Sequence, residues 1–511
     1  MKSRPAFVAA AYLFATFFGI GSAGAEIRLP NVLSSHAVLQ RDTPIHVWGW
    51  SNPGETVTVH FHDQTRSASA SSLGLWSLWL MPELAGGPYT LTAQGNAEGD
   101  SGNGAGVTRS DILVGDVWLA SGQSNMEMPL NGFPGSAVLK NADQEIAQAN
   151  LPTVRLLRIE KNSSDYPLDD VPATWTECTP QTAAQFSAVA YFFGREINTR
   201  EHVPIGLIDS TWGGTPVDSW ISMDTLGSDA GFMPAFASWA KFSDSLSTSN
   251  IIIANEKRED EAAAKAHQPV RKHDWHPAAP AWKPAGLYNA MIAPATPYTI
   301  KGVIWYQGEA NTGPERAPMY AKLFPALIAD WRRQWKEGNF PFLFVQISNF
   351  SSPNEDWGTV RDAQRRTLAV TNTAMAVTLD IGTADNVHPP DKQTVGARLA
   401  LGARALVYGE PQLTYSGPLF RTVTTEGAAL RVWFDSAKNG LVSHGPRLEG
   451  FEIAGADGKF VPATARIDGS TVIVEARGVS QPKAVRYGWA SFTNANLFNK
   501  ENLPASTFTS E

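Results

Sequence analysis

The pattern of apolar and polar positions changes twice along the chain. Between residues 45 and 93, short runs of β-branched and aromatic residues are separated by Pro53-Gly54 and Gly86-Gly87-Pro88. This pattern predicts short strands. A similar pattern returns after Gly409, where residues 455–458 are predicted as a hairpin turn. The sequence therefore predicts β-sandwich, jelly-roll-like regions before and after a different central region. The expected strands are 45–50, 56–61, 76–80 and 89–93, then 430–434, 451–453, 471–475 and 485–489.

The central region alternates strand-length apolar runs with helix-length amphipathic segments. This alternation predicts an α/β fold, with a parallel sheet covered by helices on both faces. Ligand sites in such folds lie at the carboxyl ends of the strands. The expected strands are 112–120, 205–209, 302–306, 342–347 and 375–380, and the expected helices are 183–198, 318–335, 360–370 and 392–407.

These changes divide the chain into four predicted parts. Residues 1–25 have Lys2 and Arg4 before an apolar run and end in Ala23-Gly24-Ala25, which is typical of a signal peptide. Three further parts are predicted: an N-terminal β region (26–108), a catalytic domain (109–410) with a helical and loop insertion (218–285), and a C-terminal β region (411–511). The pattern does not decide whether the two β regions pack together.

Charge and composition narrow the possible partners. The net charge of -8 is not accompanied by a cluster of basic residues, so nucleic acid is not expected as a partner. No later segment has the roughly 20 apolar residues of a membrane helix, so an exported, periplasmic or secreted protein is expected after signal cleavage. Cys178 is the single cysteine, which excludes an intrachain disulfide. The 17 Trp residues suit either sugar stacking or core packing.

Two polar loops at predicted strand ends suggest nucleophilic catalysis. Ser124 follows the strand at 112–120, and His388 follows the strand at 375–380. A serine hydroxyl needs a base to take its proton, and a carboxylate can orient that base. Asp385 precedes His388 by three residues and is the predicted acid, with Asp380 as the alternative.

Two further loops offer donors for an oxyanion. Residues 210–215 contain Gly213-Gly214 after one predicted strand, and residues 307–311 contain Gln307 and Asn311 after another. A tetrahedral intermediate requires preset N–H donors of this kind. Each loop alone is weak evidence, but four polar loops in equivalent positions favour an active site.

The order of these loops resembles the conserved blocks of the SGNH hydrolase superfamily. More closely, the chain is similar to sialate O-acetylesterases and related bacterial acetylesterases acting on plant hemicellulose. The resemblance covers nearly the whole mature chain. Its motifs include Gly122-Gln123-Ser124-Asn125-Met126, residues 212–220, 286–291 and 303–311, His388-Pro389 and residues 486–489. The core lacks the Gly-x-Ser-x-Gly elbow of α/β-hydrolases.

The resemblance implies roles for individual residues. Ser124, Asp385 and His388 are implied as a triad, with the N–H groups of Ser124 and Gly214 as oxyanion donors. The third block departs from the usual Gly-x-Asn-Asp, so both Gln307 and Asn311 are candidates for the third donor, with a slight preference for Gln307. The candidate sugar-binding residues are Gln123, Trp212, Trp305, Glu309 and Trp489, although Trp305 suits a core position equally well.

The predicted function is removal of acetyl groups from hemicellulose, xyloglucan or xylan, without a cofactor or metal. The expected partner is an acetylated oligo- or polysaccharide. Acetylated sialic acid is the alternative substrate, and a carbohydrate-binding protein with a vestigial triad is the alternative of another class. His60 with His62 and His273 with His276 are closely spaced, but neither pair has an evident third ligand for a metal.

Overall fold

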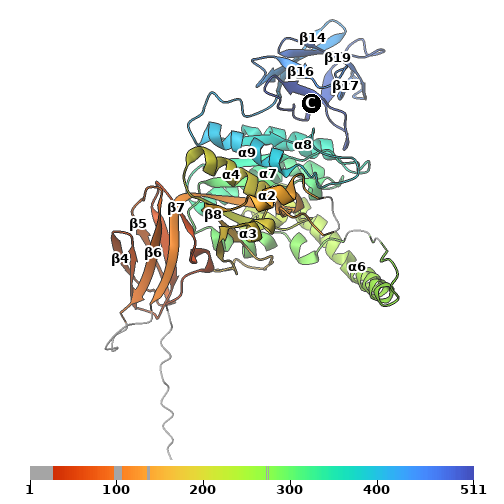
Figure 1. Cartoon of the computed structure of the whole chain (residues 1–511). Coiled ribbons are helices and arrows are strands. Elements are labelled where there is room, and N and C mark those ends of the chain that lie inside the picture. The colour runs from red at the N-terminus through yellow and green to blue at the C-terminus, as the bar shows by residue number, and fades with distance from the viewer. Residues whose placement is uncertain (1–26, 97–105, 135–137, 272, 274–275) are drawn as a thin grey trace, which may run out of the picture.

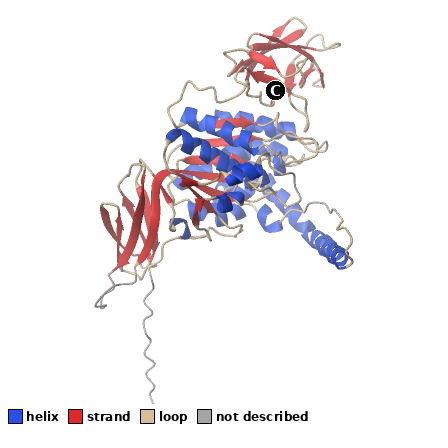
Figure 2. Cartoon of the chain, viewed as in Figure 1, coloured by secondary structure: helices blue, strands red, loops and turns tan. Residues whose placement is uncertain are grey.

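The computed structural model describes residues 27–96, 106–134, 138–271, 273 and 276–511 (Figure 1). The predicted signal peptide lies outside these residues, as does most of the Gly- and Asn-rich stretch after Gly95. Strands gather in three places, and helices surround only the middle group (Figure 2). The α/β class predicted for the central region is confirmed.

The N-terminal β region contains two sheets. In one, β3 pairs with β4 and β6, β6 pairs with β7, and β1 pairs with β7; in the other, β2 pairs with β5. Alternate side chains of β5 are buried, as expected for a strand with one face on the core. The bounds are β1 Val38–Gln40, β2 Ile45–Trp50, β3 Thr56–Phe61, β4 Gln64–Ser69, β5 Leu75–Leu80 and β6 Gly86–Gly95.

Strand β7 joins this region to the catalytic sheet. It runs for 16 residues from Val107 to Gly122, pairing first with β6 and β1 and then with β10 and β11. The predicted boundary between residues 108 and 109 therefore falls inside one continuous strand. The buried residues of both parts form a single hydrophobic core.

The central sheet has the order β13-β12-β11-β7-β10-β8-β9. All its pairs are parallel except β8 with β9. The predicted strands are confirmed, whereas β8 and β9 carry no strong strand pattern and were not predicted. The bounds are β8 Leu151–Arg158, β9 Trp175–Cys178, β10 Ile205–Thr211, β11 Gly302–Tyr306, β12 Phe342–Gln346 and β13 Thr373–Val377.

Helices cover both faces of this sheet. Helix α4 packs on α9, and α7 packs on α8. Since parallel crossovers are right-handed, these two pairs lie on opposite faces. The predicted helix at 183–198 is divided into α3 and α4, because Ser187 accepts from the Ala190 N–H and caps a new helix. The bounds are α1 Ser124–Glu127, α2 Ala142–Ala147, α3 Pro180–Ala184, α4 Ala188–Glu201, α5 Met223–Gly227, α7 Ala317–Trp335, α8 Trp357–Arg366 and α9 Lys392–Leu406.

The insertion forms one long helix, α6, from Met233 to Lys265. It projects away from the sheet (Figure 1) and buries only Ala235 among its residues. The chain returns to the body through the short helix η4 (Ala279–Trp282). The charged helical sequence predicted near residues 255–267 is thus the distal part of a longer helix.

The C-terminal β region has its own core and lies apart from the N-terminal one (Figure 1). No strand pair between the two regions occurs in the described part of the chain. The predicted turn at Gly455–Gly458 joins β17 to β18. The bounds are β14 Leu419–Glu426, β15 Ala429–Asp435, β16 Leu441–Ser443, β17 Phe451–Ala454, β18 Phe460–Pro462, β19 Thr464–Asp468, β20 Thr471–Glu475, β21 Ala484–Tyr487, β22 Leu497–Asn499 and β23 Phe508–Thr509.

Across the described ranges, no helix has both the length and the apolar character needed to cross a membrane.

Candidate active site

The nucleophile candidate Ser124 begins α1 directly after strand β7. Gly122 ends that strand with φ +133°, and a Cβ there would lie 2.2 Å from the Tyr306 carbonyl oxygen. Only glycine allows this close approach of β7 to β11. Gln123 is buried, and its side-chain oxygen accepts from the N–H groups of Gly308 and Ala310. Gln123 therefore holds the neighbouring loop and does not face solvent.

The base candidate His388 meets Ser124 across the carboxyl edge of the sheet. Its Nε2 lies 2.8 Å from Ser124 Oγ, so the sequence-predicted pair is brought together. Phe133 packs edge-on against the ring, with 5.4 Å between centroids. Burial, together with the nearby Lys392 charge, lowers the pKa of His388 to about 4. The imidazole is therefore neutral at pH 7 and able to accept the serine proton.

The acid candidates do not contact the imidazole. Asp385 is exposed, and neither a hydrogen bond nor an ion pair joins it to His388 in the described structure. The alternative acid, Asp380, accepts two hydrogen bonds of 2.7 Å from Arg398. No hydrogen bond or ion pair joins Asp380 to His388 within the described residues, so the structure lends this alternative no support.

The Gly213-Gly214 loop lies against Ser124. A Cβ on Gly213 would be 3.2 Å from the Ser124 Cβ, a tight contact that glycine avoids. The Gly213 N–H donates to Glu127 Oε2 at 2.6 Å, and the Gly214 carbonyl accepts from Trp282 Nε1 at 2.7 Å. Within the described residues, the N–H groups of Ser124 and Gly214 have no acceptor. Both are therefore available to an oxyanion.

Gln307 and Asn311 differ in the hydrogen bonds that they leave unused. Gln307 Nε2 donates both hydrogens, to Thr215 O at 3.0 Å and to Asn311 Oδ1 at 2.7 Å. By contrast, the buried Nδ2 of Asn311 has no acceptor in the described structure. The slight sequence preference for Gln307 as oxyanion donor does not fit this arrangement, because its amide has no free hydrogen.

A buried polar network lies beside the catalytic pair. Asn125 Nδ2 donates to Glu309 Oε1 at 2.6 Å and to the carbonyl of Val387 at 2.9 Å. Lys392 Nζ donates to Asn125 Oδ1. Glu309 is thus buried under the site and not placed at a sugar-contacting surface. Asn125 and Lys392 were not predicted, since their importance arises from contacts over more than 260 positions of sequence.

The three candidate tryptophans occupy different environments. Trp305 is fully buried against Trp220 and Trp331, which excludes it as a sugar platform. Trp489 is half-buried and packs on Gly358, where a Cβ would lie 2.5 Å from its ring. Trp212 is half-buried in the loop beside Ser124 and has Lys161 over its ring at 5.9 Å. The Trp212 N–H donates to the carbonyl of Gly122, two residues before Ser124, at 3.1 Å.

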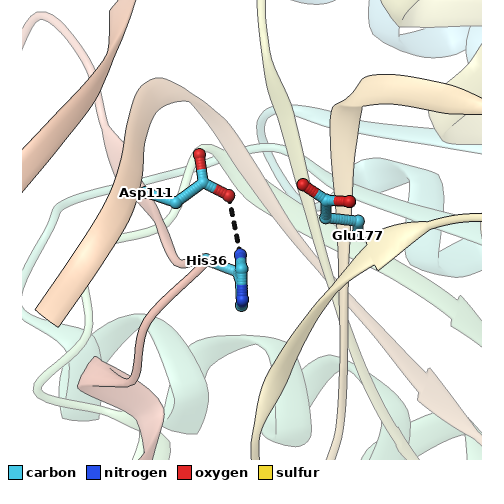
Figure 3. A group of neighbouring side chains, drawn as sticks. All are labelled: His36, Asp111 and Glu177. Atoms are coloured by element: carbon cyan, nitrogen blue, oxygen red, sulfur yellow. Dashed lines mark hydrogen bonds and ion pairs between the residues drawn. The ribbon is translucent and has the colours of Figure 1, made fainter.

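One group of metal-ligand type occurs in the described residues, away from Ser124. It consists of His36, Asp111 and Glu177 (Figure 3). His36 Nδ1 lies 2.6 Å from Asp111 Oδ2, but Arg155 also donates to that oxygen at 2.9 Å. A guanidinium so close already neutralises the carboxylate and repels a cation. The group is better described as an ion-pair cluster.

The histidine pairs noted in the sequence bind other groups. His60 Nδ1 lies 2.9 Å from Thr65 Oγ1, and His62 Nδ1 lies 3.3 Å from Glu83. In the insertion, His273 pairs with Asp260 and His276 with Glu256. His273 and His276 therefore bind the segment after helix α6 back onto that helix.

The parallel sheet and the Ser–His pair at its carboxyl edge define an ester hydrolase of the SGNH type. Residues 114–230 and 269–404 match the family described as carbohydrate esterase, sialic acid-specific acetylesterase. The chain belongs to this acetylesterase family. The unmatched segment between the two matches coincides with helix α6.

Several relatives resemble most of the chain. The mouse sialate O-acetylesterase is 31% identical, covering 92% of this chain and 91% of its own. The human sialate O-acetylesterase is 33% identical, over 78% of this chain and 74% of its own. A carbohydrate acetylesterase from Xanthomonas citri is 37% identical and has a TM-score of 0.79, covering 95% of this chain and 99% of its own.

Proposed function

We propose that Ser124 and His388 hydrolyse O-acetyl esters of carbohydrate through an acetyl-enzyme. His388 Nε2 takes the Ser124 proton as Oγ attacks the acetyl carbonyl, then gives it to the departing sugar oxygen. Water next loses a proton to His388 and attacks the acetyl-enzyme, which releases acetate and returns the proton to Ser124. The 2.8 Å contact between Oγ and Nε2 carries this proposal.

We assign oxyanion stabilisation to the N–H groups of Ser124 and Gly214 and to Asn311 Nδ2. Each lacks an acceptor in the described structure. A preset donor is most effective when no ground-state partner must be displaced. Asp385 remains our candidate for orienting His388, a role that requires its exposed carboxylate to reach the Nδ1 side of the ring.

A neutral hemicellulose, xyloglucan or xylan, is the proposed substrate. Sialic acid carries a carboxylate, which would favour an uncommitted cation at the site. Lys161, the cation beside Trp212, pairs with Glu127 at 2.6 Å. Export through the signal peptide at residues 1–25 is part of this proposal.

Acetylated sialic acid is the second candidate substrate. It is supported by the family description and by the names of the mammalian relatives. A binding protein with a vestigial triad is disfavoured, because the serine and histidine remain in hydrogen-bonding contact.

The mechanism is tested by acetate release and by hydrolysis of p-nitrophenyl acetate. Ser124→Ala and His388→Ala should each lose roughly 10³-fold or more in kcat/KM. Asp385→Asn should lose less than His388→Ala, because Asp385 makes no bond to the ring in the resting structure. Wild-type rates in either of the first two variants would exclude the mechanism.

The substrate is tested by comparing acetate release from acetylated xyloglucan, acetylated xylan and acetylated sialic acid at equal acetyl concentration. A higher kcat/KM on one of the two hemicelluloses is expected. A higher kcat/KM on acetylated sialic acid would establish it as the substrate. Equal rates on all three substrates would contradict a specificity for any one of these sugars.

A further inference from the structure

A second cleft lies on the opposite edge of the central sheet from Ser124. It has a volume of about 1070 Å³ and is bounded by the N-terminal β region, the segment before β11, the end of α7 and the end of α9. Lys301 and Pro341 in its wall directly precede β11 and β12, so it lies at their amino ends. Five-residue strands separate the two edges by roughly 16 Å. We call this site the amino-edge cleft.

The amino-edge cleft contains an exposed tryptophan that is held rigidly. Trp79 is 54% exposed, although large aromatic side chains are usually covered. Its ring stacks on His46 with 4.4 Å between centroids, and His46 stacks on Trp48 at 4.9 Å. His46 is fixed in turn, because Nδ1 lies 3.0 Å from Pro297 O and Nε2 lies 2.8 Å from Ser77 Oγ.

The rigid stack gives Trp79 the properties of a recognition surface. One face of the ring is supported by His46, while more than half of the side chain stays open to solvent. A flat, preorganised aromatic ring is well suited to the C–H face of a pyranose, since little conformational entropy is lost on binding. The carboxylates of Asp42 and Glu337 also line the cleft and can accept hydrogen bonds from sugar hydroxyls.

Two of the cations that line the cleft are paired with a buried acid. Arg41 donates to Asp116 at 3.0 Å, and Lys301 lies 3.5 Å from the same carboxylate. Arg41 and Lys301 are thus committed to a buried acid, whereas Lys336, which also lines the cleft, is exposed and has no ion-pair partner among the described residues. Burial raises the pKa of Glu337 to about 7, which allows its carboxyl group either to donate or to accept near neutral pH.

We propose that the amino-edge cleft binds a neutral polysaccharide chain through Trp79, separately from the acetyl group being hydrolysed. The choice of a neutral hemicellulose as ligand rests on the proposed function. The cleft would hold the polymer substrate close to the enzyme while another part of the polymer enters the active site.

The test measures polymer binding by the full chain carrying Ser124→Ala, which removes hydrolysis. Affinity electrophoresis and calorimetry would use deacetylated xyloglucan, deacetylated xylan and polysialic acid as probes. Adding Trp79→Ala should weaken binding of a neutral polymer at least 10-fold, and Trp79→Phe should weaken it less. Leu73→Ala is the matched control, because Leu73 is an 80% exposed apolar residue of the same β region that does not line the cleft.

Activity provides a second readout. In the otherwise wild-type chain, Trp79→Ala should leave p-nitrophenyl acetate hydrolysis unchanged and raise the KM for acetylated polymer. Unchanged polymer binding in the Trp79→Ala variant, or binding of polysialic acid alone, would overturn the inference. Binding and acetate release are measured separately, so the two proposals can fail independently. Acetate release from acetylated sialic acid alone would refute the proposed function and would leave the binding result for Trp79→Ala unaffected.

Discussion

His388 shows how single residues set the chemistry of the site. Its ring is partly buried beside Lys392, and both the burial and the lysine charge disfavour the imidazolium. Lys392 is itself buried against Asn125, and its own pKa is lowered to about 7, chiefly by desolvation. Glu309 bonds to the same asparagine and acts in the opposite direction on Lys392. The protonation state of the proposed base thus depends on a buried network of neighbouring side chains.

We expect the activity to persist at unusually low pH. A base must be unprotonated, so a pKa lowered from 6.5 to about 4 moves the acid limb of kcat/KM to lower pH. Lys392→Met removes the charge that opposes the imidazolium, and the limb should move toward 6.5. The measurement is a pH profile on p-nitrophenyl acetate. Lys140→Met is the control, since Lys140 is an exposed lysine paired with Asp391 at the start of the same helix. An acid limb of kcat/KM at pH 6.5 or above in the wild type, at the same pH in Lys392→Met, would show that Lys392 does not lower the pKa of His388.

Asn311 and Gln307 should separate into a catalytic and a structural role. Asn311→Asp removes the free donor but keeps the oxygen that accepts from Gln307 and Val217, and should lower kcat by roughly 10²-fold with little change in KM. Gln307→Met breaks the bonds to Thr215 and Asn311, and should lower the melting temperature more than it lowers kcat. Steady-state kinetics and thermal unfolding of both variants provide the comparison. A larger loss of kcat in the Gln307 variant than in the Asn311 variant would instead assign the oxyanion role to Gln307.

Among the elements, the insertion contacts the active-site loops through its return segment, the residues from the end of α6 through η4. Helix α6 extends from the body, but η4 ends at Trp282, whose Nε1 binds the Gly214 carbonyl. The sequence indicated an insertion, although it did not indicate this contact. The part of α6 before residue 255 was also not predicted, since Ser, Thr and three consecutive Ile residues weaken the helical pattern there.

Trp282→Phe tests the contact between these elements. The ring is kept while one hydrogen bond to the Gly214 loop is lost, so kcat/KM should fall about 5-fold, equivalent to about 1 kcal/mol. Trp433→Phe is the control, because Trp433 Nε1 donates to Thr424 in the C-terminal β region. Equal effects of the two changes on p-nitrophenyl acetate hydrolysis would argue against a role of the return segment.

For the whole molecule, Arg361 connects the catalytic domain to the C-terminal β region. It is fully buried and donates to the carbonyls of Ile347 and Ser348 on one side and of Ala490 and Ser491 on the other. Burial lowers the pKa of its guanidinium to about 9. Only the planar fork of arginine reaches this many acceptors at once.

Arg361→Lys should therefore destabilise the protein by roughly 3 kcal/mol, because several buried carbonyls lose their donor. Denaturant unfolding, followed by tryptophan fluorescence, measures the change. Arg421→Lys alters an exposed pair with Asp435 and should cost less than about 1 kcal/mol. Similar midpoints for both variants would show that Arg361 does not hold the two regions together.

The parallel sheet and the Ser–His pair could be predicted because strand periodicity and strand-end position are local properties of the sequence. Contacts between distant segments could not. Asn125 looks like an ordinary motif residue until it reaches Val387, and Trp305 resembles an exposed platform as much as a core residue until the packing of α7 is known. Asp385 has the right spacing to His388, but spacing does not fix where a loop carboxylate points.

Strand β7 makes the N-terminal β region and the nucleophile parts of one stiff element, without a flexible linker between them. A polymer bound in the amino-edge cleft would thus be held at a constant reach from Ser124, and not over the spread of distances that a linker samples. Acetyl groups would then be removed at a fixed interval from the point of attachment. The distance between the amino-edge cleft and Ser124 would then set the spacing of the acetyl groups that remain on the polysaccharide.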